Sequence, residues 1–269
     1  MPTVQFFVTC LVDTFYPETA EAIVSILNHL GVDVDFPQAQ TCCGQPQFNA
    51  GLRMDARQMA RHMIETFERL PKSLKTSEVC HVVSPSGSCV HMIRHNYPEL
   101  FADDPDWLPR AQALAKRTFE FTEYLVDVLG VTDPSIPFQA QASSGRRLDA
   151  YWEGTLTYHP SCHLSRGLGI DRQPRALLAQ VQGATIVELP EAEDCCGFGG
   201  IFSVAHPELS AEFLKRKISN LEKTQAPTLV VADTGCIMHI AGGLGRQKKP
   251  QRVVHIAEVL NHRSSEGTM

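Results

Sequence analysis

The chain has 269 residues, of which 43% are hydrophobic and 20% charged, and its formal net charge is -6 at pH 7. This composition excludes a chain that is disordered throughout, and the negative charge without a lysine and arginine stripe argues against nucleic-acid binding. No apolar stretch approaches the roughly 20 residues that a membrane-spanning helix needs, so we expect a cytoplasmic protein that is not transmembrane.

The first half of the chain alternates short apolar runs with amphipathic helical patterns. A strand is predicted over residues 4–8, followed by a helix that begins at about Pro17 and stops at Gly31. A second strand is predicted over residues 32–36. After Cys42-Cys43-Gly44 we expect a helix that reaches Leu70, then a strand over 79–83, and then a short helix opened by Cys89.

The second half repeats this order. The predicted elements are strands over 155–158, 185–189 and 229–232 and helices over 174–181 and 207–221. Strands that alternate with crossover helices indicate a mainly parallel sheet with helices on both faces. The expected fold class is therefore α/β, with two pseudo-repeated Rossmann-like halves. We place the first domain at residues 1–130, the second at 151–269, and a linker with proline, serine and glycine at 131–150.

Eight of the nine cysteines fall into two sets of one design. The first set is Cys10, Cys42, Cys43 and Cys89, and the second is Cys162, Cys195, Cys196 and Cys236. Corresponding members lie 152, 153, 153 and 147 positions apart, and such near-constant offsets indicate an internal repeat. Further on the offset drops to 135, because the first half carries about a dozen extra residues around Tyr97 to Pro109.

The two sets are predicted to gather at the carboxyl edge of the sheet. Four of the cysteines follow strand ends, and each Cys-Cys-Gly lies in a turn between a strand and a helix, where open α/β folds bind ligands. Nearby helix N-termini favour the thiolate form. We assign Gly44 and Gly197 as cofactor-binding, because glycine keeps the turn permissive and lets the backbone approach a bulky group.

Four cysteines per half favour an iron-sulfur cluster over zinc. A single tetrahedral zinc ion is usually held by Cys-x2-Cys pairs, and neither half contains one. Adjacent cysteines suit a multi-iron cluster, in which separate iron atoms each take a thiolate. A structural zinc site, or dithiol chemistry of the vicinal pairs Cys42-Cys43 and Cys195-Cys196, remains the alternative. All eight cysteines of the two sets are assigned as metal ligands.

Cys80 lies outside both sets, and two histidines beside Cys162 have two interpretations each. Cys80 has no counterpart in the second half and is expected to lie in the core. His159 and His163 flank Cys162 and could donate hydrogen bonds to cluster sulfur or take up protons, or could be structural. We assign His163 as cofactor-binding. No flavin or nicotinamide fingerprint is present, and no catalytic residue is assigned.

Two further groups are interpreted as structural. Glu123 and Glu258 recur at matching positions of the two halves and are expected to cap or pack short helices. Met54, Met59 and Met63 lie at near-helical spacing and are expected to fill the core.

The motifs around the cysteines resemble those of a known family. They are Cys42-Cys43-Gly44-Gln45-Pro46, Ser86-Gly87-Ser88-Cys89, Tyr158-His159-Pro160-Ser161-Cys162-His163, Cys195-Cys196-Gly197-Phe198-Gly199-Gly200 and Thr234-Gly235-Cys236. Together they resemble the tandem CCG cysteine-rich domains of the lactate utilization protein A family. Similar domains occur in the iron-sulfur subunit of glycolate oxidase and in the CCG-containing chain of heterodisulfide reductase.

The resemblance implies an iron-sulfur electron-transfer subunit of a multi-subunit oxidoreductase that converts L-lactate to pyruvate without NAD. It implies up to one cluster per half, of the 4Fe-4S type, because Ser86 and Asp233 stand where heterodisulfide reductase has a further cysteine. It also implies a ferredoxin-like iron-sulfur subunit and a further subunit of the complex as partners. Any attachment to a membrane is expected to run through those partners. The choice of lactate over glycolate comes from the resemblance alone.

Overall fold

The computed structural model describes residues 2–71, 80–131 and 148–263, and its first half is built on a parallel four-stranded sheet. The strand order is β2-β1-β3-β4. The strands are β1 (Thr3–Phe6), β2 (Asp33–Asp35), β3 (His81–Ser84) and β4 (Thr118–Glu120). The α-helices are α1 (Cys10–Phe15), α2 (Pro17–His29), α3 (Gln45–Asn49), α4 (Arg53–Glu68), α5 (Gly87–His91), α6 (Tyr97–Leu100), α7 (Leu108–Lys116) and α8 (Phe121–Glu123). The π-helical turns are η1 (Met92–Asn96) and η2 (Tyr124–Val128).

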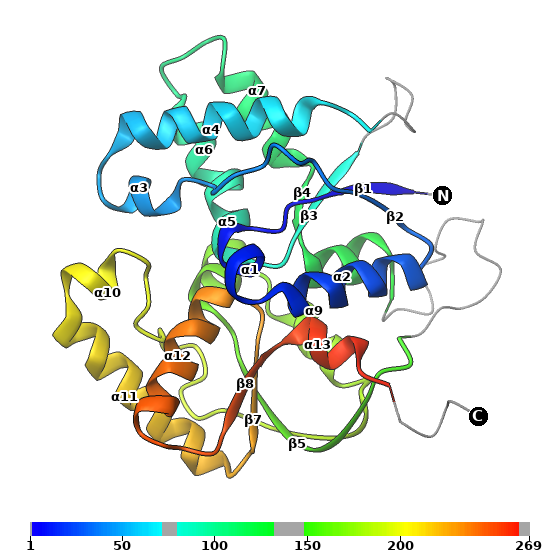
Figure 1. Cartoon of the computed structure of the whole chain (residues 1–269), viewed down its shortest axis with the longest axis vertical. Helices are drawn as coiled ribbons and strands as arrows, with labels where there is room; N and C mark the ends of the chain where they lie inside the picture. The colour runs from blue at the N-terminus through cyan, green and yellow to red at the C-terminus, as the bar shows by residue number, and fades with distance from the viewer. Residues whose placement is uncertain (1, 72–79, 132–147, 264–269) are drawn as a thin grey trace.

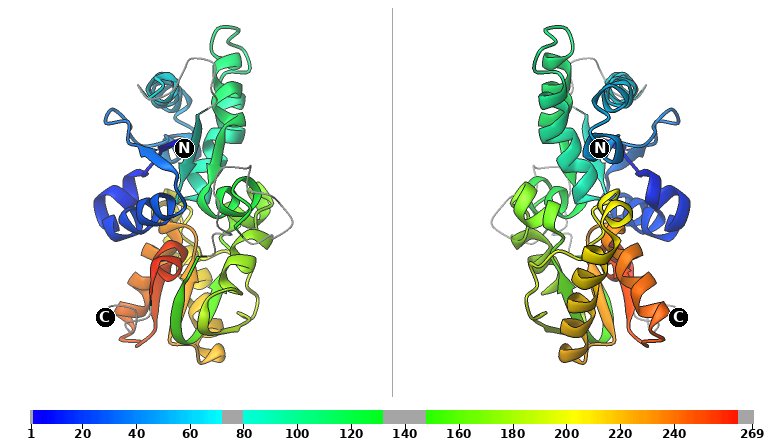
Figure 2. Two further views of the ribbon diagram at one scale, coloured as in Figure 1. Left: turned by 90° about the vertical axis from the view of Figure 1, so that its right-hand side faces the viewer. Right: turned by 90° about the vertical axis from the view of Figure 1, so that its left-hand side faces the viewer.

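The second half has a parallel sheet of the same topology, in the order β6-β5-β7-β8. The strands are β5 (Tyr151–His159), β6 (Gln182–Val187), β7 (Thr228–Val231) and β8 (Arg252–His255). The helical segments are η3 (His163–Gly167), α9 (Arg172–Leu178), α10 (Phe202–Ala205), α11 (Pro207–Thr224), α12 (Thr234–Arg246) and α13 (Ile256–Asn261). Figure 1 shows this half below the first, and both side views in Figure 2 keep that arrangement.

The strand register confirms the repeat. Phe6 pairs with Val83 in the first sheet, and Tyr158 pairs with Val230 in the second, which reproduces the offsets of 152 and 147. The outer strands β4 and β8 were not predicted, and their pairing reproduces the offset of 135. The extra residues of the first half form α6 and the start of α7. The predicted α/β fold of two similar halves is thus confirmed.

The predicted helices and strands are found with shifted ends. The strand expected over residues 79–83 is β3, which begins at His81, and Val79 lies outside the described residues. The helix expected after the first Cys-Cys-Gly is divided into α3 and α4 at Gly51, whose φ is +77°. The expectation for Met54 was wrong, since 66% of it is exposed. Met54 precedes the buried stripe of α4, which starts at Ala56.

Three apolar cores hold the two sheets and their helices together. One face of each sheet contributes to a single shared core, to which β1 adds Phe6 and β5 adds Tyr158. Helices α2 and α13, one from each half, pack against each other around this core. The opposite faces pack against α4 in the first half and against α11 and α12 in the second. Each sheet is thus covered on both faces, as predicted.

The junction of the halves is tied into the shared core. Most of the linker expected over residues 131–150 lies outside the described residues. Its described ends, Val131, Leu148 and Ala150, are buried in the shared core. We therefore keep the two-domain division as a proposal in which the halves fold against one another. None of the helices in the described ranges is long and apolar enough to cross a membrane.

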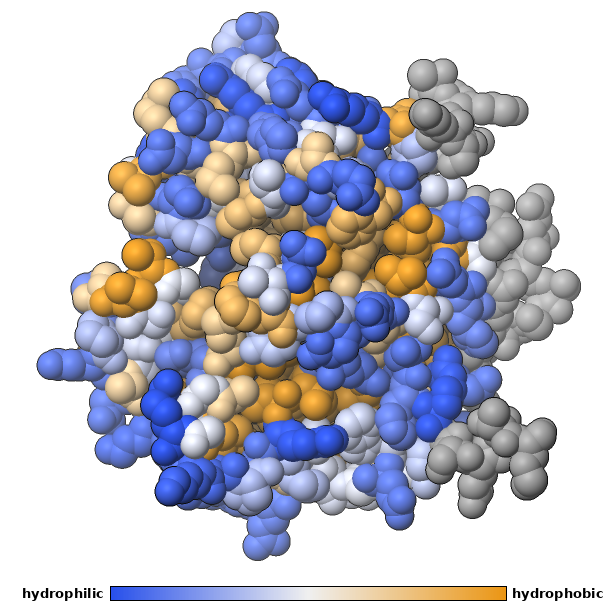
Figure 3. Space-filling model, viewed as in Figure 1, coloured by the Kyte–Doolittle hydropathy of each residue, from blue (hydrophilic) through white to orange (hydrophobic). Residues whose placement is uncertain are grey.

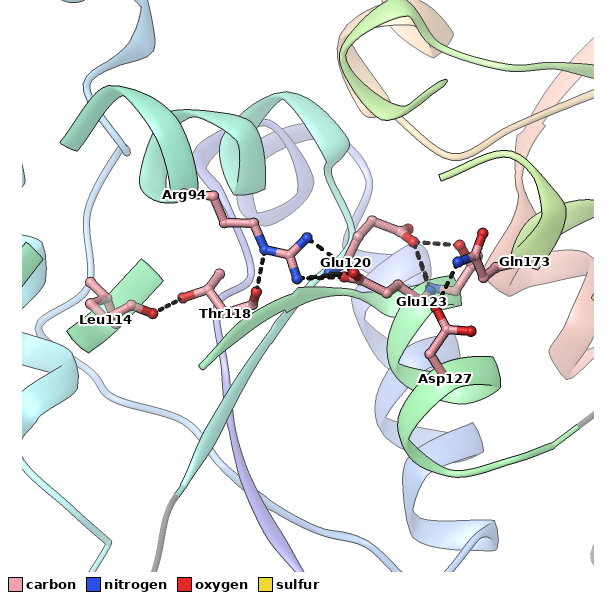
Figure 4. A network of polar contacts seen from close by, with 8 residues as sticks. Arg94, Leu114, Thr118, Glu120, Glu123, Asp127 and Gln173 are labelled. Atoms are coloured by element: carbon pink, nitrogen blue, oxygen red, sulfur yellow. Dashed lines mark hydrogen bonds and ion pairs between the residues drawn. The ribbon is translucent and has the colours of Figure 1, made fainter. Parts of the chain in front are cut away.

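Matching capping boxes start the last helix of each half. Glu120 caps α8 together with Glu123, and His255 caps α13 together with Glu258. Figure 4 shows Glu123 beside Glu120 and paired with Arg94, whose Nη2 lies 2.8 Å from Glu123 Oε2. The capping interpretation of Glu123 and Glu258 is confirmed. It explains why glutamate recurs at these positions without any need for acid-base chemistry.

Candidate metal centre

All eight repeated cysteines line one cavity of about 140 Å³ between the halves. The sequence predicted one thiolate-lined pocket in each half. The carboxyl ends of β1 and β3 meet those of β5 and β7, so both cysteine sets open into the same space. The helices α5 and α12 carry Cys89 and Cys236 into this space, and α1 begins at Cys10.

In the first set, Cys42 is the residue that most readily holds a negative charge. Hydrogen bonds from Cys10 and Cys43, together with the backbone N–H of Gly44, lower the pKa of Cys42 to about 3. The buried sulfur of Cys43 lies 3.4 Å from that of Cys89. Tyr97 donates a hydrogen bond from its hydroxyl to the carbonyl of Cys43, at 2.9 Å, and so fixes the turn.

The second set repeats this pattern. Hydrogen bonds from Cys162 and Cys196 lower the pKa of Cys195, and the N–H of Gly197 donates to its sulfur at 3.3 Å. The sulfur of Cys196 lies 3.1 Å from that of Cys236. Cys42 and Cys195 are therefore equivalent residues whose surroundings lower the thiol pKa, each at the first position of a Cys-Cys-Gly turn.

The cysteines keep the thiol chemistry that metal binding needs. All nine are free, and five of them are buried: Cys43, Cys80, Cys89, Cys196 and Cys236. Cys80 lies apart, with its sulfur 3.5 Å from the carbonyl of Thr3, and it is buried as expected. The cavity thus gathers soft, polarisable donors at one place, which is the donor type that iron-sulfur clusters and other thiophilic metals prefer.

The two predicted glycines, Gly44 and Gly197, lie in the turns that carry the paired cysteines. Gly44 and Gly197 have φ values of +84° and +93°, and cavity-lining residues flank them on both sides. A Cβ atom at Gly197 would lie 2.6 Å from the carbonyl oxygen of Ser210, and one at Gly44 would lie 3.3 Å from Met59 Cβ. Packing against α11 thus requires glycine at position 197, and the positive φ favours glycine at position 44. The amide groups of both turns face the cysteine sulfurs.

The two histidines that flank Cys162 differ in their surroundings. His163 lines the cavity, and its Nδ1 lies 3.9 Å from the sulfur of Cys162. Its ring also stacks edge-on against His91 of the first half, at a centroid distance of 5.1 Å. His159 is fully buried and lies with Cys196 and Cys236 in one group of potential metal-binding atoms.

Lys217 is a residue near this site that the sequence interpretation missed. It is 1% exposed on α11 and donates from Nζ to the carbonyls of Glu191 and Ala192, both at 3.0 Å. The signal that could have found it is a lysine within the apolar stripe of an amphipathic helix. Its charge lies close enough to Cys196 and Cys236 to offset thiolate charge on them.

Comparison with known proteins gives consistent matches over nearly the whole chain. A family model described as a cysteine-rich domain, CCG, matches twice, at residues 4–94 and 156–241. Lactate utilization protein A of Exiguobacterium sp. is 47% identical over 261 residues, which cover 97% of this chain and 98% of that protein. The proteins of the same name from Oceanobacillus iheyensis and Bacillus cytotoxicus are 45% and 44% identical, with coverage of 96% or more of each chain.

Proposed function

This chain belongs to the lactate utilization protein A family of tandem CCG cysteine-rich domains, and from that premise we propose that it is an iron-sulfur electron-transfer subunit. The system it serves would be a multi-subunit oxidoreductase that converts L-lactate to pyruvate without NAD. The observation that carries the proposal is that both cysteine sets line one cavity. Separate structural sites would not require the two sets to meet.

The residues in the cavity fit iron-sulfur clusters of the 4Fe-4S type, up to one per half. Four cysteines per half match the four thiolates that such a cluster takes. When bound, such clusters accept and release single electrons. The chain itself would hold them by Cys42 and Cys195, whose thiolate form is already favoured, and by their cysteine neighbours. The burial of Cys43 and Cys196 would keep water away from the metal.

The shared cavity also supports transfer between the halves. Its lining runs from Cys10 and Cys42 on one side to Cys162 and Cys195 on the other, and Ser86 and Asp233 line it between. Two redox centres held in one cavity are close neighbours, so an electron that enters through one half can leave through the other. Oxidation of lactate releases two electrons, which suits a carrier with two sites.

The alternative is a zinc-bound or metal-free thiol-redox protein. The distances of 3.4 Å and 3.1 Å between the buried cysteine pairs favour it, since two thiolates on one tetrahedral ion lie about 3.8 Å apart. Tetrahedral zinc also takes four cysteine ligands, but the adjacent cysteines of each Cys-Cys-Gly turn suit separate iron atoms better than one ion. An all-thiolate set of eight is explained more fully by clusters.

An exposed apolar surface next to the cavity supports a partner subunit. The segments that follow the two Cys-Cys-Gly turns expose Leu52 by 53%, Met54 by 66% and Val204 by 74%. Figure 3 shows apolar colour on the left margin, over α10 and beside the junction of α3 and α4. Gly199 and Gly200, just before α10, line the cavity. We propose that the ferredoxin-like subunit docks here, with a further subunit of the complex completing the system.

The proposed function is tested by following the chain in its native complex. The full-length protein would be purified anaerobically from its own cells with whatever chains accompany it, and its visible absorption recorded after substrate is added. L-lactate should bleach the iron-sulfur absorption, and the accompanying chains should include an iron-sulfur protein. If glycolate bleaches the absorption and L-lactate does not, the substrate in the proposal would be glycolate instead of L-lactate. No bleaching by any 2-hydroxy acid would overturn the electron-transfer role.

A further inference from the structure

The buried imidazole of His159 lies beside the sulfurs of Cys196 and Cys236 in the second cysteine set. His159 is the last residue of β5 and is 0% exposed. Its ring nitrogen and the sulfurs of Cys196 and Cys236 all lie within 4.8 Å of one another. Cys162 follows three residues later, so a strand end delivers both an imidazole and a thiolate to the same place.

The hydrogen bonds of His159 fix which nitrogen is free. Nδ1 lies 3.2 Å from the carbonyl oxygen of Ala192, and because a carbonyl can only accept, Nδ1 carries the proton. Lys217 donates to the same carbonyl at 3.0 Å. Nε2 is buried and faces the sulfur of Cys236, and no hydrogen bond to any other of the described residues occupies it. A neutral imidazole held in this way presents its Nε2 lone pair, as metal-binding histidines do when they donate their other N–H to a carbonyl.

The first half has no equivalent of this group. The offset of 152 places Phe7 where the second half has His159, and Phe7 is fully buried in an apolar core. The buried positions of α4 and α11 differ by 154, which places Met63 opposite Lys217. The two halves therefore share their cysteines and differ in the imidazole and ammonium groups behind them.

We propose that His159 Nε2 is a metal ligand of the second half, so that the two halves hold metal through different donor sets. The first half offers four thiolates, and in the second half the imidazole would take the place of one of the four thiolates on the metal. This inference rests on the proposed metal binding and not on the identity of the metal. An imidazole in place of a thiolate makes an iron-sulfur centre less negative and raises its reduction potential. The two sites would therefore differ in reduction potential, with the site of the second half at the higher potential.

The test isolates the second half inside the full-length chain. In a Cys43→Ala background, which is expected to empty the first half, the reduced protein is examined by pulsed EPR after anaerobic purification. A nitrogen hyperfine coupling should be present, should change on 15N-histidine labelling and should vanish in His159→Gln. It should persist in the control His206→Gln, which alters an exposed histidine of the second half that does not line the cavity. Coupling that survives in His159→Gln would overturn the inference.

A second probe does not depend on iron. Co²⁺ is titrated into the metal-free chain in the same Cys43→Ala background and followed by its thiolate absorption bands. His159→Gln should weaken Co²⁺ binding by about tenfold or more, as expected for loss of a ligand, and the control His206→Gln should not. His159→Cys should restore binding without the nitrogen coupling, which separates a ligand role from a failure to fold.

The outcomes distinguish the inference from the proposed function. Iron present, with neither the nitrogen coupling nor a His159-dependent Co²⁺ affinity, would leave the function standing and remove the ligand. If instead the Co²⁺ affinity depends on His159 but the chain never takes up iron, the ligand role of His159 would stand and the proposed function would be removed.

Discussion

Ser86 donates a hydrogen bond from its hydroxyl to Asp233 Oδ2 across the boundary between the halves, at 3.0 Å. The two residues occupy equivalent positions of the repeat, 147 apart, and are 2% and 4% exposed. Asp233 also accepts from the backbone N–H of Ser88 at 2.9 Å and of Gly235 at 3.0 Å. These are the positions at which a fifth cysteine was missing, and both are engaged in joining the halves.

The Ser86 and Asp233 contact should contribute measurably to stability. Asp233→Ala leaves the N–H of Ser88 and the Ser86 hydroxyl without their acceptor, and a buried unsatisfied group costs about 1–3 kcal/mol. Urea unfolding of Ser86→Ala, Asp233→Ala and the double variant should give a coupling free energy of about 0.5–3 kcal/mol. The exposed pair Arg110 and Glu68 is the control and should couple by about 1 kcal/mol or less. Equal coupling in both pairs would contradict the account.

Acid should weaken the protein through His255. This histidine accepts from Ala257 N–H on Nδ1 and donates from Nε2 to the carbonyl of Pro85 at 3.0 Å, so it is held neutral. Burial lowers the pKa of His255 to about 4, against 6.5 when unfolded. Between those values the unfolded chain binds the extra proton, so the free energy of unfolding falls as the pH falls from 6.5 to 4. The slope is up to about 1.4 kcal/mol per pH unit.

High pH should lower the stability of the folded protein through Glu120, which occupies the position equivalent to His255 in the repeat. Burial raises the pKa of Glu120 to about 8 from an ordinary 4.5, so the folded chain retains a proton that the unfolded chain loses. This stabilisation is complete below pH 4.5 and is lost as the pH rises through 8. In urea unfolding measured from pH 5 to 9, Glu120→Gln should reduce the fall in the free energy of unfolding at high pH. The fall toward low pH, which His255 causes, should remain in this variant. An unchanged alkaline decline in Glu120→Gln would contradict the assignment.

Each half should lose its metal independently. Cys43→Ala should remove the iron of the first half and Cys196→Ala that of the second, because each residue is a buried member of one set. Iron and sulfide per chain should fall by about half in either variant and almost completely in the double variant. Cys80→Ala is the control, since Cys80 is buried away from the cavity, and it should keep all of its iron. Complete loss from a single substitution would indicate one shared cluster.

The exposed apolar residues beside the cavity should matter for association and not for folding. Val204→Asp and Met54→Asp place charges on surfaces that are 74% and 66% exposed, so the chain should fold and load metal normally. Co-purification of the iron-sulfur partner should drop at least about tenfold, as expected when a charge enters the apolar centre of an interface. Glu68→Gln, at the opposite end of α4 from Met54, is the control. Unchanged co-purification in both aspartate variants would exclude this surface.

The sequence predicted the inner strands of both sheets and the edge strands β2 and β6, but not the edge strands β4 and β8. Thr118-Phe119-Glu120 and Arg252-Val253-Val254-His255 are too short and too polar to show a strand pattern. Their capping glutamates did recur at a constant offset and marked the positions. Repeat spacing thus located what periodicity could not.

The cysteine sets were predictable from spacing, but the single cavity was not. Its formation depends on how the halves pack, through the shared core and contacts such as Ser86 with Asp233, and nothing local in either half encodes that. For the same reason His159 gave no clear signal: its importance comes from where β5 ends relative to Cys196 and Cys236.

The most direct test of the central claim is the iron and acid-labile sulfide content of the full-length chain after anaerobic purification. The account predicts a brown protein with at least one iron-sulfur cluster per chain, held in the cavity that the cysteines line. A colourless protein that carries zinc, or no metal at all, after the same handling would contradict it.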